Sequence, residues 1–274
     1  MKICSCIVIY NPPEEVISHV KDLLVFSNAV LVLDNSVSMN ATSQKISKIP
    51  GINYISFHEN KGLAYALKYG AEFSVRNKYD YMLTMDQDSI FPLEHKDDIL
   101  NLLNKNPQYS ILALNYLETK PDSKPVYTVN EWITSGSFIK LDDYQKIDGF
   151  NKDLFIDYVD YDLCEQMISK GFKIGVMNNI HLGHQLGEPT TKKILGKKIT
   201  YSNHSPARDY YRYRNELYLY LKNKKYYRAL HKAERKNLII IMLFEKKRLQ
   251  KLKMIMLGKR HARKGHLGKL NVIK

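Results

Sequence analysis

Short apolar runs alternate with helical repeats along the first 90 residues of the chain. Four runs of apolar and β-branched residues predict buried strands at 3–10, 29–33, 52–57 and 81–85. Between them, apolar residues at intervals of three and four predict helices at 14–26 and 63–75. Strands that alternate with helices are typical of a mostly parallel sheet with helices on both faces, so the pattern predicts a Rossmann-like α/β fold.

The second half has shorter and less regular elements. Strands are predicted at 112–115, 126–129 and 173–177, and helices from about Asp160 to Gly171 and over 208–221. The stretch 134–139, TSGSFI, carries Gly136 between two serines, which allows backbone to approach a ligand closely. The stretch 180–187 is predicted to be a loop with two histidines.

Polar side chains follow several of the predicted strands. In open parallel sheets, ligands bind outside the carboxyl ends of the strands. The residues expected at this edge are Tyr10, Asn11, Asp34, Lys61, Asp86, Gln87 and Asp88. Asp86 and Asp88 would share one face of extended chain, about 7 Å apart, and would suit a divalent cation with a phosphate-bearing ligand. Each position also fits ordinary turn chemistry, and a D-x-D pair alone fits an acidic loop.

Three further groups in the second half are candidates for chemistry. Asp157, Asp160 and Asp162 surround the start of a predicted helix, where acids also occur simply because they favour a helix N-terminus. His184 could complete a metal site at an edge that already carries carboxylates. The helix 208–221 carries Arg208, Tyr211 and Arg214, which suit phosphate oxygens or a solvated basic face with packed tyrosines.

The net charge of +14 is concentrated at the C-terminal end. Residues 222–274 contain 18 Lys and Arg against two acids, whereas residues 1–221 are nearly neutral. We therefore predict a catalytic domain at 1–221 and a basic helical tail at 222–274. The run 238–244, LIIIMLF, is far shorter than the about 20 residues that span a bilayer. Its Lys- and Arg-rich flanks favour binding in the plane of an anionic membrane.

The tail has two other interpretations, a helix docked on the catalytic domain and a nucleic-acid-binding patch. No nucleic-acid-binding fold is recognisable and few aromatic residues are interleaved with its cations, so no nucleic-acid partner is expected. The cysteines Cys4, Cys6 and Cys164 form no metal-binding spacing and fit a reducing cytosol. A strand pattern begins almost at once, so no signal peptide is expected.

An ordered set of motifs gives the chain a resemblance to a known family. The motifs are IVIYNP at 7–12, LDNS at 33–36, ENKGLAYALKYG at 59–70, MDQDS at 85–89, TSGSF at 134–138, FIDYVDYDLC at 155–164, HLGH at 181–184 and HSPARDYYRYRN at 204–215. From about Ile3 to Asn215 the chain resembles the family-2 inverting glycosyltransferases of GT-A fold, within them the bacterial rhamnosyltransferase-like group. The resemblance implies a nucleotide-binding half at 1–90 and an acceptor half at 91–221.

The same resemblance implies roles for individual residues. Donor-binding roles fall to Tyr10, Asn11, Asp34, Lys61, Asp86, Gln87, Arg208, Tyr211 and Arg214. Asp86, Asp88 and His184 would face Mg²⁺ or Mn²⁺. Asp160 would be the general base that deprotonates the acceptor hydroxyl. The family often has Glu-Asp where this chain has Val159 and Asp160, so Asp157 stays a second candidate for the base.

The sequence therefore predicts a metal-dependent inverting glycosyltransferase. The resemblance implies L-rhamnose from dTDP-rhamnose as donor and a lipid-linked or polymeric cell-surface glycan as acceptor, with UDP-galactofuranose or another UDP-hexose as alternative donors. A cytoplasmic enzyme, peripheral on the inner face of the plasma membrane, is expected, and a homodimer is compatible with the sequence.

Two other classes are less favoured. A phosphatase with a nucleophilic D-x-D-x-[TV] strand would carry the motif after an early strand, whereas here it follows the fourth and position 90 is Ile. A non-enzymatic module that binds membranes or nucleic acid through the basic tail would leave the strand-end residues without a role.

Overall fold

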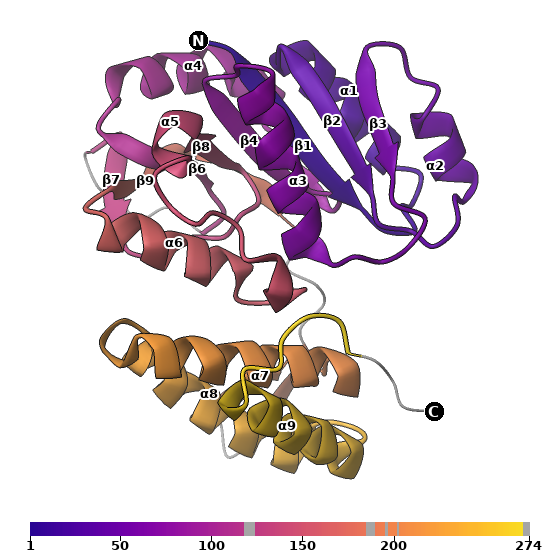
Figure 1. The fold of residues 1–274 in the computed structure, drawn as a ribbon, viewed down its shortest axis with the longest axis vertical. Helices are drawn as coiled ribbons and strands as arrows, with labels where there is room; N and C mark the ends of the chain where they lie inside the picture. Colours follow the sequence, from indigo (N-terminus) through magenta and orange to yellow (C-terminus); the bar gives the residue numbers. More distant parts are fainter. Residues whose placement is uncertain (118–123, 185–189, 195–196, 202, 271–274) are drawn as a thin grey trace. The chain divides into compact units, whose positions relative to one another are not determined.

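The computed structural model describes residues 1–117, 124–184, 190–194, 197–201 and 203–270 (Figure 1). Of His184, 190–194 and 197–201 it describes the backbone. The chain divides into two compact units. The first unit comprises 1–152 and 159–184, and the second comprises 153–158 and 185–274. The hexapeptide 153–158 therefore belongs to the second unit although it lies between two segments of the first.

The first unit is built on an eight-stranded sheet in the order β3-β2-β1-β4-β8-β6-β9-β7. Its strands are β1 (Ile3–Ile9), β2 (Ala29–Asp34), β3 (Ile52–Ser56), β4 (Tyr81–Asp86), β6 (Tyr109–Asn115), β7 (Val126–Val129), β8 (Ser137–Lys140) and β9 (Lys173–His181). The first four are parallel, as the sequence predicts, and β6 is parallel to β9. β8 runs antiparallel to both β4 and β6, and β7 runs antiparallel to β9, so the sheet is mixed beyond β4.

Helices cover both faces of this sheet (Figure 1). The helices of this unit are α1 (Val16–Phe26), α2 (Ala41–Ile46), α3 (Leu63–Arg76), α4 (Lys96–Lys105), α5 (Leu141–Tyr144) and α6 (Val159–Ser169). The main core joins apolar residues of α1, α2 and α4 to one face of the strands. On the other face α3 lies so close to β1 that a Cβ added at Gly70 would come within 2.5 Å of the Cys6 sulfur. Both faces of the sheet are therefore covered by helices, which is why the sequences of its strands are continuous apolar runs.

The predicted elements of this unit are found, with shifts of a few residues at their ends. Among the elements that fall outside the prediction are α2, α4, α5 and β8. β8 occupies part of the TSGSFI stretch, which the sequence analysis treats as a ligand-approach segment. The predicted histidine loop is partly extended, because His181 ends β9 and His184 lies in β10 (Gly183–His184), which pairs with β5 (Ser89–Ile90).

The second unit contains three long helices, α7 (Pro206–Lys222), α8 (Lys224–Phe244) and α9 (Arg248–Arg263), and the antiparallel pair β11 (Thr190–Ile194) and β12 (Lys197–Tyr201). α7 begins at an N-cap, where Ser205 accepts from the Arg208 N–H at 3.2 Å and Pro206 follows. α7 packs most closely on α9, where a Cβ added at Gly258 would meet the Tyr210 carbonyl oxygen at 2.6 Å.

The compact units do not divide at residue 221, where the charge balance changes. α7 belongs with α8 and α9, because its buried tyrosines pack against apolar residues of the tail, among them Ile255 and Leu257. The change in charge near residue 221 reflects the composition of exposed residues, whereas the boundary between the two compact units follows the packing of buried residues. Throughout the described part of the chain, the helices are too short or too polar to cross a bilayer.

Candidate functional site

The carboxyl ends of β1, β2 and β4 bring two predicted acids to one edge of the sheet. Val8 of β1 is paired with Asp86 of β4, and Ile9 is paired with Asp34 of β2. β1 therefore lies between the two acids, whose Cα atoms stand about two strand spacings, or about 10 Å, apart. This is the edge at which open α/β sheets bind ligands.

Asp34 is fully buried and both of its carboxylate oxygens accept hydrogen bonds. The N–H of Ser36 donates at 2.8 Å and the hydroxyl of Tyr54 donates at 2.5 Å. Burial and the bonded Asp34 carboxylate raise the pKa of Tyr54, so its hydroxyl keeps the donated proton. In this structure Asp34 fixes the end of β2 through these two bonds.

The loop after β1 is fixed to the loop after β4. The Tyr10 N–H donates to the Gln87 side-chain oxygen at 2.8 Å, and His19 Nδ1 lies 3.0 Å from the Gln87 carbonyl oxygen. Asn11 has a φ of 45°, and its N–H donates to the Ser36 hydroxyl at 2.7 Å. The Tyr10 ring is 46% exposed, so it is available to stack on a planar group such as a base.

Lys61 stands at the start of α3 on the same edge. Its N–H donates to the Asn35 side-chain oxygen at 3.2 Å, and the Asn35 amide donates to the Gly62 carbonyl at 3.1 Å. The Lys61 ammonium lies 3.4 Å from a Glu59 oxygen and 5.0 Å from the centre of the Tyr65 ring. It is a partly exposed cation beside the ends of β2 and β3.

The stretch 134–137 connects the end of β4 to the residues around α6. The Ser135 hydroxyl accepts from the Asp86 N–H at 3.1 Å and donates to the Ser89 hydroxyl at 2.8 Å. The Gly136 N–H donates to the Thr84 carbonyl at 2.8 Å, with a φ of 74° at Gly136. Asp86 is half-buried and Asp88 is exposed. The backbone of Asp86 is thus held by the loop 134–137, which the sequence analysis identified through its glycine and as part of the motif TSGSF.

Asp160 lies in the first turn of α6. It lines a cavity of only about 10 Å³, room for about one water molecule, together with Trp132, Thr134 and Ser137. Burial and the nearby charges of Asp160 and Glu131 raise the pKa of Tyr116. Burial raises the pKa of Cys164 to about 12, and Asp160 adds to that effect. Asp160 is half-buried in surroundings that hold aromatic residues and a second acid, Glu131, whose own pKa is raised by burial.

The backbone of His184 lies beside the acid pair. β10 pairs with β5 so that His184 stands opposite Ser89, the residue after Asp88. The His184 side chain lies outside the described residues. Among the side chains that the structure does describe, no three or more His, Cys, Asp or Glu residues gather into a group that could hold a metal ion.

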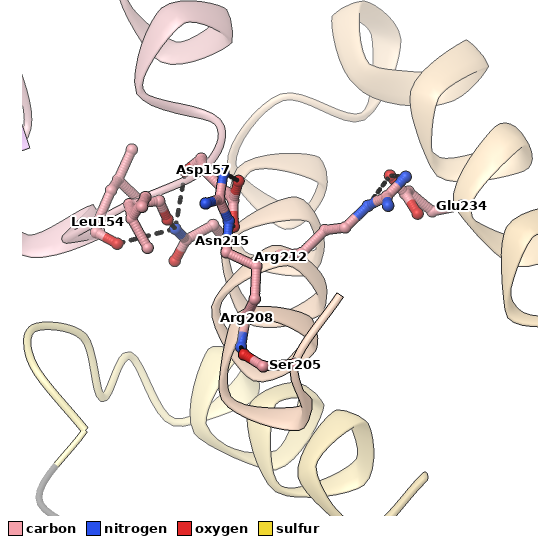
Figure 2. A network of polar contacts seen from close by, with 8 residues as sticks. Leu154, Asp157, Ser205, Arg208, Arg212, Asn215 and Glu234 are labelled. Carbon is pink, nitrogen blue, oxygen red and sulfur yellow. Dashed lines mark hydrogen bonds and ion pairs between the residues drawn. The ribbon is translucent and has the colours of Figure 1, made fainter. Parts of the chain in front are cut away.

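Asp157 and Arg208, which belong to the second unit, form a two-armed ion pair (Figure 2). The Nε and Nη2 atoms of Arg208 each donate to a different Asp157 oxygen at 2.7 Å. Asn215 donates from its side-chain amide to the carbonyls of Leu154, Ile156 and Asp157 at 2.8–2.9 Å (Figure 2). These bonds hold the hexapeptide 153–158, in which Phe155, Asp157 and Tyr158 all have positive φ.

Arg214 and Tyr211 also serve this hexapeptide in the structure. Arg214 is fully buried, and its guanidinium donates to the carbonyls of Asp153, Leu154 and Gly268. Tyr211 stacks on Phe155 with ring centres 4.7 Å apart, and its hydroxyl accepts from the Leu270 N–H. A contact of Arg214 with a diphosphate would require these bonds to break, so here it acts as a structural arginine.

Sequence reasoning missed several residues that position the site. Tyr54 and Ser36 hold Asp34, Ser135 holds the end of β4, and Asn215 holds the hexapeptide. The sequence signal for Tyr54 was its place in β3. Tyr54 pairs with Val32, and two residues further along the same two strands Ser56 pairs with Asp34. Asn215 is predicted to share a helix face with Arg208 and Tyr211, but its donor role could not be predicted, because the carbonyls that it bonds lie about 60 residues away.

Comparisons with known proteins agree on one family. Residues 5–154, more than half of the chain, match the model of glycosyl transferase family 2. A dTDP-rhamnosyl transferase, RfbF of Shigella flexneri, is 26% identical over 242 residues, which are 81% of this chain and 80% of that protein.

Solved structures of TarS from S. aureus share the fold. TarS 1–349 has a TM-score of 0.52 at 14% identity, with 97% of this chain and 72% of that chain covered. The same fragment in complex with UDP also has a TM-score of 0.52, at 15% identity, with coverage of 95% and 72%. With the mixed sheet and its strand-end residues, these findings confirm the expected GT-A fold. The chain belongs to glycosyl transferase family 2 and is a glycosyltransferase.

Proposed function

We propose that this enzyme transfers L-rhamnose from dTDP-rhamnose, with inversion at the anomeric carbon, to a lipid-linked or polymeric cell-surface glycan. The observation that carries the proposed mechanism is the polar connection between the acid pair at the end of β4 and the loop 134–137, which also lines the Asp160 cavity. The donor rests on the relationship to a dTDP-rhamnosyl transferase over four-fifths of the chain. UDP-galactofuranose or another UDP-hexose is the alternative donor.

Asp160 is the proposed general base. Inverting transfer is an in-line displacement in which a base takes the proton of the acceptor hydroxyl. Asp160 lines a cavity beside Thr134. Both oxygens of the other candidate, Asp157, are bonded to Arg208. With both oxygens occupied by Arg208, Asp157 has no oxygen left to face an acceptor hydroxyl, which supports Asp160 over Asp157.

Tyr10, Asn11, Asp34, Lys61 and Gln87 are proposed to form the nucleotide side of the site. The exposed Tyr10 ring suits a base, and Asp34 would exchange its bond from Tyr54 for one from a ribose hydroxyl. The Lys61 ammonium suits the charge of the diphosphate. We keep Arg208 as a proposed diphosphate ligand, because its side chain is 42% exposed even when paired. Tyr211 and Arg214, which are buried on α7, would support the position of Arg208 indirectly.

Asp86 and Asp88 are proposed to hold Mg²⁺ or Mn²⁺, with His184 as a further ligand. Two carboxylates at a strand end fit a hard cation, because Mg²⁺ is commonly bound by one or two carboxylates plus the phosphates of a substrate. A bound cation supplies charge stabilisation to the departing nucleoside diphosphate. The protein's own part is to fix the Asp86 backbone through Ser135 and leave Asp88 exposed toward an incoming ligand.

We further propose that the enzyme works in the cytoplasm, peripheral on the inner face of the plasma membrane. The support is the basic composition of residues 222–274 and the apolar run in α8, which fit binding in the plane of an anionic surface. An acceptor carried on a lipid would be met at that surface.

A thermal-shift screen tests the proposed donor. The purified chain would be heated with dTDP-rhamnose, UDP-galactofuranose and UDP-glucose, each with Mn²⁺ and with a chelator, and transfer would then be measured with the stabilising sugar. We expect the largest metal-dependent rise in melting temperature with dTDP-rhamnose. A larger rise with a UDP-sugar would replace the donor, and no rise with any nucleotide sugar would remove the proposal.

A further inference from the structure

A basic groove lies on the surface of the helical unit, and its lining contains none of the residues assigned above. Its volume is about 810 Å³, and its walls come from α7, α8 and α9. The cations that line it are Arg228, Lys232, Arg235, Lys236 and Lys259. Tyr220, His231, Leu238 and Ile239 complete the lining, which contains no acid. A groove with five cations and no acid has an unbalanced positive charge.

Several of the groove cations lie on a stripe of α8 that is separate from its buried residues. Tyr227, Glu234 and Ile241, at seven-residue intervals, are the buried residues of α8. Arg228, Lys232, Arg235 and Ile239 recur at intervals of four, three and four and form a separate exposed stripe. The cationic stripe is therefore not required for the packing of this helix.

The stripe changes character along the helix axis. Its first half carries the cations, and its second half continues through Ile239 to Leu243, which are 60% and 56% exposed. Exposed branched apolar side chains next to a cationic groove match a molecule with an anionic head and an apolar tail. A free phosphate ion would use the cations and leave Ile239 and Leu243 without a role.

Lys259 lies among both like and opposite charges. Burial lowers the pKa of Lys259, and Arg263 and Arg235 lower it further, while Glu216 and Glu234 oppose them. Glu216 is bonded to His231 at 2.6 Å, and Glu234 is bonded to Arg212 at 2.8 Å. Both nearby acids are thus already engaged, and an anion in the groove would offset the charge of its cations.

We infer that this groove binds the headgroup phosphate of an anionic phospholipid, with the lipid's acyl chain against Ile239 and Leu243. The inference deepens the proposed membrane association and rests on it. It converts a general attraction between the basic tail and the membrane into a defined site, in which five named cations contribute more than the other thirteen Lys and Arg residues of 222–274.

Flotation with lipid vesicles tests the site on the full chain. The groove variant is Lys232→Gln/Arg235→Gln/Lys236→Gln. The charge-matched control is Lys246→Gln/Lys253→Gln/Lys264→Gln, whose exposed side chains are not part of the groove lining. Vesicles of phosphatidylcholine with phosphatidylglycerol are compared with vesicles of phosphatidylcholine alone, and circular dichroism checks that each variant is folded.

We expect the groove variant to lose about 100-fold in partitioning to phosphatidylglycerol vesicles, and the control about tenfold or less. A third variant, Ile239→Gln/Leu243→Gln, should lose partitioning with every cation intact. Equal losses in the groove variant and its control would overturn the inference, since they would show charge without a site. Full competition by inorganic phosphate would also overturn it and assign the groove to a free anion.

The same samples separate this inference from the proposed function. The groove variant should keep the wild-type thermal shift with dTDP-rhamnose and Mn²⁺, because the groove shares no residue with the strand-end site. Wild type could show no thermal shift with the nucleotide sugar while the groove variant alone loses binding to vesicles. In that case the donor proposal fails and the lipid-binding inference is kept.

Discussion

Arg208 and Asp157 form two parallel hydrogen bonds of 2.7 Å, which join the first turn of α7 to the hexapeptide 153–158. Asp157 adopts a φ of 66°, a left-handed conformation that costs a non-glycine residue free energy. The pair therefore stabilises a strained segment that ends immediately before α6. It also makes the roles of Asp157 and Asp160 experimentally separable.

Replacing Asp157 by Asn should lower stability more than catalysis. Asn tolerates positive φ and keeps the size of the side chain, but its amide oxygen can accept only one of the two bonds from Arg208, and the ion pair is lost, at a cost of about 1–2 kcal/mol. Urea unfolding would measure that cost, and initial rates would show kcat within a few-fold of wild type. Arg208→Lys, which keeps the charge without the two-armed geometry, is the matched variant. Abolished transfer with unchanged stability would instead identify Asp157 as the base.

Replacing Asp160 by Asn should remove transfer and spare donor binding. Loss of a general base typically costs about 10²–10⁴-fold in kcat. Calorimetry with the nucleotide should give a Kd close to that of wild type, because the donor residues lie at the strand ends. Asp142→Asn, which changes an exposed acid at the start of α5, is the control and should leave both quantities unchanged. Persistent transfer in the Asp160 variant would rule out its assigned role.

Replacing Asp88 by Ala should weaken nucleotide binding only when metal is present. The side chain is exposed, so its removal should leave folding unaffected. The nucleotide would be titrated once with Mn²⁺ and once with a chelator. For wild type the Kd with chelator should exceed the Kd with Mn²⁺, and for the variant the ratio of the two should fall toward one. An equal loss of affinity under both conditions would count against a metal-binding role.

Replacing Asn215 by Asp should destabilise the second unit. The carboxylate has the same shape but cannot donate to the three carbonyls of the hexapeptide, which would lose their shared donor and face a charge. We expect a loss of about 3 kcal/mol in the free energy of unfolding. The same substitution at Asn223 is the control, because there the side-chain oxygen accepts from the Tyr226 N–H and a carboxylate can do the same. Similar losses at both positions would show that the donor role of Asn215 is unimportant.

Asp209 should give the helical unit a pH-dependent stability. Burial raises its pKa to about 6, although Lys251 lies 3.5 Å away and opposes the shift. The folded carboxyl therefore keeps its proton to a higher pH than the unfolded chain does, so the free energy of unfolding falls as pH rises from about 4 to 6. The fall is at most about 3 kcal/mol. Urea unfolding across this range should show a shallower slope for Asp209→Asn, and an unchanged slope would exclude Asp209 as its source.

Much of the first unit follows from the sequence because its strands are buried on both faces. Apolar runs such as 3–10 and 81–85 leave little choice of structure, and strand ends follow from the first polar residues. The antiparallel direction of β8 could not be predicted, because Ser137 and Gly136 face a partner, Thr84, about 50 residues earlier in the chain. Short elements such as α2 carry too few apolar positions to show a period.

The second unit was harder to predict because packing and charge gave different boundaries. The charge change near residue 221 is a property of the surface, whereas the buried faces of α7 depend on partners in α9. Arg214 shows the same problem for a single residue. Its place in an arginine- and tyrosine-rich motif predicts phosphate binding. In the structure its guanidinium donates to three backbone carbonyls and to the Asn215 side-chain oxygen, and the carbonyl partners leave no trace in a sequence.

The nested position of 153–158 has a consequence for how such enzymes can be recombined. A chimaera that exchanges only the C-terminal helices with those of a relative would leave this hexapeptide behind, with Asn215 and Arg214 replaced by residues that evolved beside a different loop. A functional exchange therefore has to transplant two separate pieces of chain, the six residues before α6 together with everything after β10.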